Sequence, residues 1–84
     1  MNIYVGNLDF KVNEDDLQKV FEEYGTVSSA KIIVDKFTGR SKGYGFIEMD
    51  DDSDASKAIK DLDGSVMENR EIVVNEAKPR KTRY

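Results

Sequence analysis

The chain has 84 residues, with 17 acidic and 13 basic side chains, no histidine and no cysteine, and a formal net charge of -4. This length supports one domain, and the missing residue types exclude disulfides, thiolate or imidazole zinc sites, and Ser-His-Asp or Cys-His catalysis. No run of about 18 apolar residues occurs, so we expect a cytoplasmic protein with no membrane partner, metal or other cofactor.

The charge is unevenly distributed along the chain. Residues 14–23 carry five acidic residues and one basic one, and residues 48–54 carry five acidic residues and no basic one. The remainder carries 12 basic and 7 acidic residues, a net charge of +5. The acidic total disfavours a nucleic-acid partner, whereas the basic segments leave that partner open.

The first two predicted elements are a strand and a helix. Ile3 and Val5 alternate with polar or small residues, which is typical of a half-buried strand, here ending at Asn7. Asn13 is a candidate N-cap for a helix, and we expect Gly25 to end that helix in the left-handed conformation. Between them, apolar residues recur at the spacing of one helical stripe; they are Leu17, Val20, Phe21 and Tyr24.

A second strand is predicted over residues 27–35. Its alternation directs Ala30, Ile32 and Val34 towards the core and leaves Lys31 and Ile33 on the other face. The polar and basic segment that follows, residues 36–41, predicts a loop.

A third strand is predicted over residues 43–49, and a second helix follows it. On the strand, alternation places Gly45, Ile47 and Met49 on one face, and Tyr44, Phe46 and Glu48 on the other. Residues 50–53 offer helix caps, and Gly64 is expected to end the helix. The helical stripe consists of Ala55, Ala58, Ile59 and Leu62.

The remaining residues predict a short hairpin and a fourth strand. Residues 66–70 form the hairpin, turning near Asn69, because asparagine tolerates left-handed geometry. Ile72 and Val74 alternate with outward-facing residues in the strand. The order of elements is therefore βαββαβ, an α+β ferredoxin-like sandwich in which two helices cover one face of a four-stranded antiparallel sheet.

This architecture leaves the other face of the sheet open. Tyr4, Tyr44 and Phe46 fall on that face, and they gather there because the first and third strands are neighbours at its centre. An exposed aromatic cluster is typical of a binding surface, and aromatic rings stack on unpaired bases. The alternative is that the rings belong to the core or mask one another as cross-strand pairs.

Two segments resemble the motifs of one family. Residues 42–49 (KGYGFIEM) resemble the octapeptide of the RNA-recognition motif, or RRM, with Ile47 and Met49 as departures. Residues 3–8 (IYVGNL) resemble the hexapeptide of its first strand. The resemblance covers residues 1–78, leaving a short basic tail, and the chain is similar to small single-RRM proteins of bacteria and to the RRM of plant glycine-rich RNA-binding proteins. The tail is residues 79–84.

The resemblance implies a set of RNA-binding residues. Tyr4 and Tyr44 would stack on neighbouring bases, and Phe46 would lie between two sugars. Lys42 would contact a phosphate. Glu48 occupies the free position of the motif, where a carboxylate either repels phosphate or accepts from a base amino group. Asn75 and Ala77 lie where members of the family often hydrogen-bond base edges. The further candidates for phosphate contacts come from the charge distribution and are Lys31, Arg40, Lys78 and Arg80. The alternative is that the loop cations are solvated surface charges and that the tail is a frayed basic terminus.

We therefore expect a monomeric single-stranded RNA-binding module of low sequence specificity, with neither a catalytic role nor a small-molecule substrate. Single-stranded DNA is a second expected ligand, because stacking does not require the 2′-hydroxyl. One alternative is an RRM-like protein-interaction domain that uses the same sheet face for a peptide. A phosphate-cleaving enzyme on this sandwich is disfavoured, because residues 8–13 contain neither arginine nor glycine.

Overall fold

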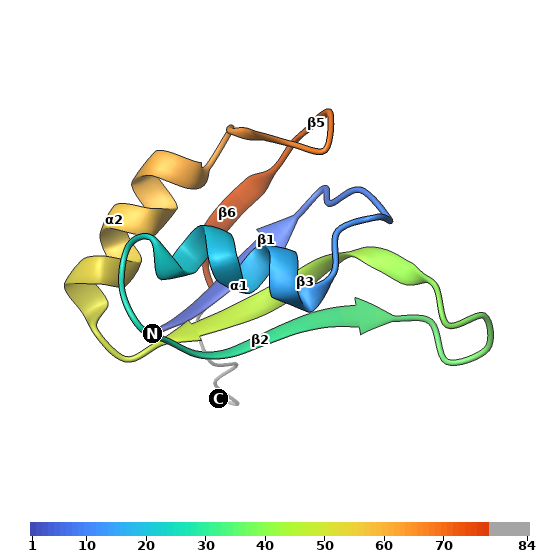
Figure 1. Ribbon diagram of the computed structural model, residues 1–84, viewed down its shortest axis with the longest axis horizontal. Coiled ribbons are helices and arrows are strands. Elements are labelled where there is room, and N and C mark those ends of the chain that lie inside the picture. Colours follow the sequence, from blue (N-terminus) through green and yellow to red (C-terminus); the bar gives the residue numbers. More distant parts are fainter. Residues whose placement is uncertain (78–84) are drawn as a thin grey trace, which may run out of the picture.

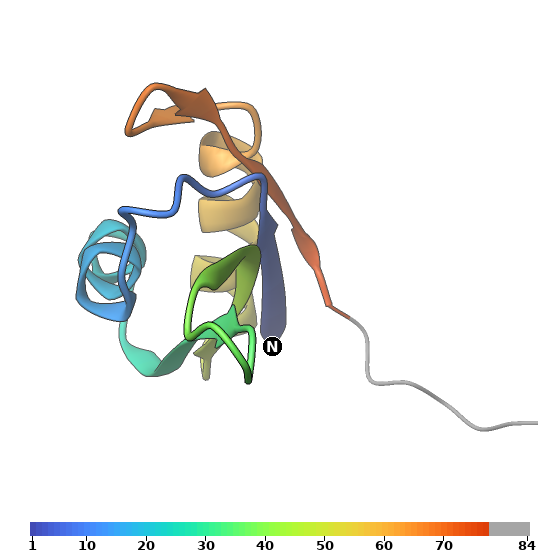
Figure 2. The same cartoon turned by 90° about the vertical axis from the view of Figure 1, so that its right-hand side faces the viewer.

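A computed structural model describes residues 1–77 and contains two helices among the strands (Figure 1). The order is β1 (Asn2–Gly6), α1 (Glu14–Glu22), β2 (Val27–Val34), β3 (Ser41–Met49), α2 (Asp52–Leu62), β4 (Val66–Met67), β5 (Arg70–Glu71) and β6 (Val73–Glu76). Strands β4 and β5 form a separate two-stranded hairpin, and the main antiparallel sheet has the order β2-β3-β1-β6. Both helices lie on the same side of that sheet (Figure 2). The predicted ferredoxin-like α+β fold is confirmed.

The core lies between the helices and the sheet. The inward residues of β1 and β3 that alternation predicted are buried there, and Met49, which replaces an aromatic residue of the family octapeptide, is fully buried. Helix α1 contributes Leu17 and Phe21, and helix α2 contributes Ala55 and Ala58. Within residues 1–77, no helix is long and apolar enough to cross a membrane.

Both helices begin at side-chain caps. The Asp16 backbone N–H donates to Asn13 Oδ1 at 2.8 Å, and Asp16 Oδ2 accepts from the Asn13 backbone N–H at 3.2 Å, a reciprocal capping box. Asp51 caps α2 by accepting from the backbone N–H groups of Ser53 and Asp54. The Ser53 hydroxyl also donates to Asp51 Oδ1, at 3.0 Å. The bond from the Asp54 backbone contributes most, and that from the Ser53 hydroxyl next, to holding the pKa of Asp51 below its usual range. The caps explain why the helices start where they do.

The prediction that Gly25 ends α1 in the left-handed conformation is wrong. The C-cap is Glu23, with right-handed dihedral angles, and Gly25 is not among the glycines with positive φ. A Cβ atom on Gly25 would instead collide with the carboxylate of Asp54. Glycine is therefore required here by the close approach of α2. The corresponding prediction for Gly64, whose φ is +84°, is confirmed.

The prediction that Val34 faces the core is also wrong, since half of its surface is exposed. The register between β2 and β3 shifts between Ile32 and Val34, and such an irregularity reverses the side-chain alternation beyond it. Ile32 itself is buried as expected. Its backbone N–H donates to the carboxylate of Glu14 on α1 at 3.0 Å.

The short hairpin turns where the sequence predicts. Glu68 and Asn69 both have positive φ values, 51° and 68°, as a two-residue turn between β4 and β5 requires. The hairpin brings Arg70 back towards the end of β1, where it contacts Asn7. The hairpin thus brings a basic side chain to the end of β1.

Candidate nucleic-acid interface

Three aromatic side chains form a cluster at the centre of the open sheet face. Tyr4 of β1 lies opposite Phe46 of β3 in the strand register, and Tyr44 lies two residues before Phe46. The ring centroids are 5.9 Å apart for Tyr4 and Phe46, 6.0 Å for Tyr4 and Tyr44, and 6.2 Å for Tyr44 and Phe46. We call these three rings the aromatic platform.

The platform is separate from the core. The residues that alternate with the rings along the strands, among them Ile3, Val5 and Ile47, are buried on the helix side. Phe46 keeps 37% of its surface exposed, although the three rings partly cover one another edge to face. The alternative that the rings are core residues is therefore wrong, whereas the alternative of a cross-strand pair holds for Tyr4 and Phe46, which contact each other edge to face.

Gly6 allows the ring of Tyr4 to lie along the strand. A Cβ atom on Gly6 would come within 2.5 Å of the Tyr4 hydroxyl and 2.8 Å of two ring carbons. Such distances are too short for any side chain, so the position of this ring depends on a glycine two residues further along.

The side chains around the platform are arranged in rows across the sheet. In the first row, Asn75 of β6 pairs with Tyr4, Tyr4 pairs with Phe46, and Phe46 pairs with Lys31 of β2. Two of the predicted contact residues, Lys31 and Asn75, thus flank the rings on opposite sides.

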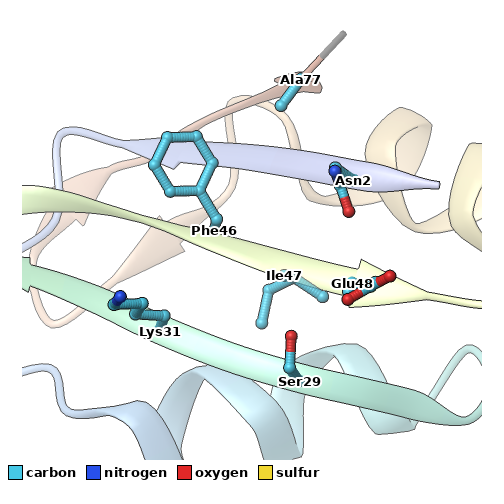
Figure 3. Close-up of a pocket in the computed structure, with 7 residues that line it drawn as sticks. All are labelled: Asn2, Ser29, Lys31, Phe46, Ile47, Glu48 and Ala77. Atoms are coloured by element: carbon cyan, nitrogen blue, oxygen red, sulfur yellow. The ribbon is translucent and has the colours of Figure 1, made fainter. Parts of the chain in front are cut away.

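A second row, entirely without rings, runs beside the first (Figure 3). Glu48 of β3 pairs with Asn2 of β1 on one side and with Ser29 of β2 on the other. The backbone N–H of Ala77 donates to the carbonyl of Asn2 at 2.8 Å, which places the predicted contact residue Ala77 at the end of this row. Between the two rows lies a cavity of about 290 Å³, lined by Asn2, Ser29, Lys31, Phe46, Ile47, Glu48 and Ala77.

A second cavity of about 290 Å³ lies at the opposite end of the platform. Lys42 lines it together with Tyr4 and Tyr44. Arg70 and Asn7 line it as well, and Arg70 Nη2 donates to Asn7 Oδ1 at 2.8 Å. Sequence reasoning missed Arg70, since only the folded hairpin brings this cation to the platform.

The remaining predicted basic residue within residues 1–77, Arg40, does not line either of the two cavities beside the platform. Arg40 is exposed in the loop between β2 and β3, where its carbonyl accepts from the backbone N–H of Asp35 at 2.8 Å. The carboxylate of Asp35 accepts from the backbone N–H groups of Phe37 and Thr38, and these bonds lower its pKa. The predicted tail contacts, Lys78 and Arg80, and the predicted domain boundary at residue 78 lie outside the described residues.

Comparison with known proteins extends the observations on the site. The family model described as the RNA recognition motif matches residues 3–73. The chain belongs to this family. Its sheet therefore presents the aromatic platform of an RRM, with both family motifs on the central strands β1 and β3.

Two similar proteins and one complex place this RRM among its relatives. RbpB of Nostoc sp., which bears the name of an RNA-binding protein, is 48% identical over 83 residues, covering 99% of this chain and 81% of that protein. The crystal structure of RNA Binding Protein PG1 is 48% identical with a TM-score of 0.92, and covers 98% of this chain and 99% of that one. The Sxl-lethal protein in its complex with RNA is 30% identical with a TM-score of 0.89. The match covers 95% of this chain and 48% of that one.

Proposed function

We propose that this RRM binds single-stranded RNA on its open sheet face by base stacking and phosphate contacts, without chemical conversion of the RNA. The single observation that carries the proposal is the aromatic platform, three neighbouring rings with centroids 5.9–6.2 Å apart on a face that no helix covers. RNA-binding relatives and a related complex with RNA support it.

Stacking supplies the main attraction. Tyr4 and Tyr44 each carry one base, and Phe46, which stands edge-on to both, packs against the sugars between them. Each stacked base contributes about 1–3 kcal/mol. Because every base has a π-face, this contribution is tolerant of sequence, and it acts on single-stranded DNA as well.

Phosphate contacts come from the cations around the platform. Lys42 and Arg70 lie at one end of the platform, and Lys31 lies beside Phe46. Arg40 contacts the RNA backbone from the loop between β2 and β3. Two further cations come shortly after the end of β6 in the sequence. Lys78 is the last residue of the proposed domain, and Arg80 belongs to the proposed tail, residues 79–84.

The net negative charge of the chain does not oppose this binding directly. The acidic residues of the first turn of α1 are Glu14, Asp15 and Asp16, and Asp51 caps α2. Both helices lie on the opposite side of the sheet (Figure 2). Exposed charges interact strongly only within about 10 Å at 0.1 M salt, so the local balance at the open face is set by the cations around the platform together with the carboxylate of Glu48.

Base edges meet hydrogen-bonding groups at the border of the platform. Asn75 pairs with Tyr4 in the register, and Ala77 follows two residues later. In this proposal, the Asn75 amide and the backbone around Ala77 contact the edge of a base that lies next to Tyr4. These contacts modulate sequence preference without determining it.

The test is an NMR titration of the labelled full chain with a short single-stranded RNA of mixed sequence at low salt. We expect chemical-shift changes concentrated on Tyr4, Tyr44, Phe46 and Lys42, with α1 and α2 unaffected. Absence of shifts at millimolar RNA would overturn the proposal. A peptide that shifted the same resonances instead would favour the protein-interaction alternative.

A further inference from the structure

We propose that the cavity between Phe46 and Glu48 is a guanine-selective subsite, in which the Glu48 carboxylate reads the base edge. This inference rests on the proposed function and deepens it, since it assigns a base to a place on the RNA-binding face. The cavity of about 290 Å³ is close to the lower limit of small-ligand sites, about 300 Å³. It has one aromatic wall, Phe46, and polar groups on two other sides (Figure 3).

Glu48 is the unusual member of this cavity. Its side chain is exposed on the open face, flanked by Asn2 and Ser29 in neighbouring strands. Among residues 1–77, the Glu48 carboxylate takes part in no ion pair and no side-chain hydrogen bond. A carboxylate next to an RNA backbone is repelled by phosphate, so its presence is favourable only where the ligand offers hydrogen-bond donors.

Guanine is the base whose edge fits a carboxylate best. An ionised carboxylate is an acceptor with two oxygens and has no donor. Guanine presents two adjacent donors on its Watson–Crick edge, the N1–H and the N2 amino group, and one carboxylate can accept from both. Adenine and cytosine present one donor beside an acceptor, and uracil presents one donor between two acceptors. A carboxylate therefore ranks guanine first and uracil last.

Lys31, on the other side of the cavity, supplies a hydrogen-bond donor for the acceptors of guanine. It lies opposite Phe46 in the register and lines the same cavity as Glu48. Its ammonium is a donor without an acceptor, and guanine carries acceptors at O6 and N7. The Asn2 amide has both a donor and an acceptor, so it does not discriminate, and the selectivity is assigned to Glu48 and Lys31.

The test compares oligouridines that differ in one central nucleotide: guanosine, inosine, adenosine, cytidine or uridine. Inosine keeps O6, N7 and N1–H and lacks only the N2 amino group. Fluorescence anisotropy with the full chain measures each dissociation constant at fixed low salt. We expect guanosine to bind tightest and its replacement by inosine to weaken binding about tenfold, the effect of one hydrogen bond to a charged group.

The variant Glu48→Gln separates recognition of the base from general electrostatics. Removing the charge is expected to tighten binding of every oligonucleotide, because phosphate repulsion falls, while the ratio between guanosine and inosine drops to less than about twofold. Glu22→Gln, on the helix α1 that covers the other face, is the matched control and keeps the tenfold ratio. Because Glu48 is exposed, the fold of the variant is expected to be intact, which an NMR spectrum verifies.

The outcomes distinguish the two proposals. Equal affinity of the unmodified chain for the guanosine and inosine oligonucleotides would overturn guanine selectivity and leave RNA binding in place. A tenfold ratio that survives in Glu48→Gln would overturn the role of Glu48. Failure of all five oligonucleotides to bind would overturn the proposed function and this inference with it.

Discussion

The phenol ring of Tyr4 lies directly over Gly6, two residues further along the same strand. The space between them is too small for one methyl group, which would come within 2.8 Å of two ring carbons. Position and exposure of this ring are therefore determined by a residue that contributes no side chain to the surface. We therefore expect Gly6 to affect the open face through Tyr4.

Replacing Gly6 with alanine is expected to displace the ring of Tyr4 and to weaken RNA binding by up to the contribution of one stacked base, about 1–3 kcal/mol. Titration calorimetry with a short RNA measures the loss. In a Tyr4→Ala background, Gly6→Ala is expected to have no further effect on affinity. Additive effects of the two substitutions would show that Gly6 acts by another route.

Removing the ring of Tyr44 by Tyr44→Ala is expected to cost about 1–3 kcal/mol of RNA binding with little change in the free energy of unfolding. The reason is that this ring lies on the open face, outside the buried core. Urea denaturation and an RNA titration on the same sample check both halves of the prediction. If the variant unfolds, the ring is structural and the stacking assignment is wrong.

Truncating Met49 is expected to lower the stability of the fold and to leave RNA affinity unchanged, the opposite of Tyr44→Ala. Its side chain is fully buried against the helices, so Met49→Ala is expected to destabilise the fold by about 2–5 kcal/mol. Under conditions where the variant remains folded, its RNA affinity is expected to equal that of the unmodified chain. Weaker binding by the folded variant would mean that the core and the open face are coupled.

A phosphate contact by Lys42 is expected to contribute to the salt dependence of RNA affinity. Each phosphate contact on a single strand contributes about -0.7 to the slope of log affinity against log salt concentration. Lys42→Gln is therefore expected to make the slope less negative by about 0.7. Lys57→Gln, on α2 on the opposite side of the sheet, is the control and should leave the slope unchanged. Identical slopes for both variants would remove Lys42 from the phosphate contacts.

The cap of α2 predicts a pH dependence of stability. The hydrogen bonds from Asp54 and Ser53 favour the ionised form of Asp51, so its pKa is lower in the folded chain than in the unfolded one. Its stabilising contribution is then complete above the unfolded pKa, about 3.9, and is lost as the pH falls through the lower folded value.

Asp51→Asn keeps a capping oxygen but removes the titration. Urea midpoints measured from neutral to acid pH should therefore fall less steeply for Asp51→Asn than for the unmodified chain below about pH 4. Parallel curves for the two proteins would contradict the role of the ionised cap.

The alternation of side chains was sufficient to predict the sheet, the buried side of β3 and the aromatic platform. Each of these follows from local periodicity together with one topology. Val34 and Gly25 were predicted wrongly because their environments are set by contacts distant in sequence: the register shift between β2 and β3, and the approach of Asp54 to Gly25. Arg70 was missed for the same reason, since its link to Asn7 spans 63 residues.

The separation of Tyr4 and Tyr44 limits the kind of RNA that this face accepts. Bases in a regular helix follow one another at about 3.4 Å, whereas these rings lie 6.0 Å apart and side by side. Two neighbouring bases that occupy both rings must give up their stacking on each other, and with it any pairing to a second strand. Under the proposed stacking on both rings, binding competes with RNA secondary structure and shifts the folding equilibrium of the RNA towards the open form.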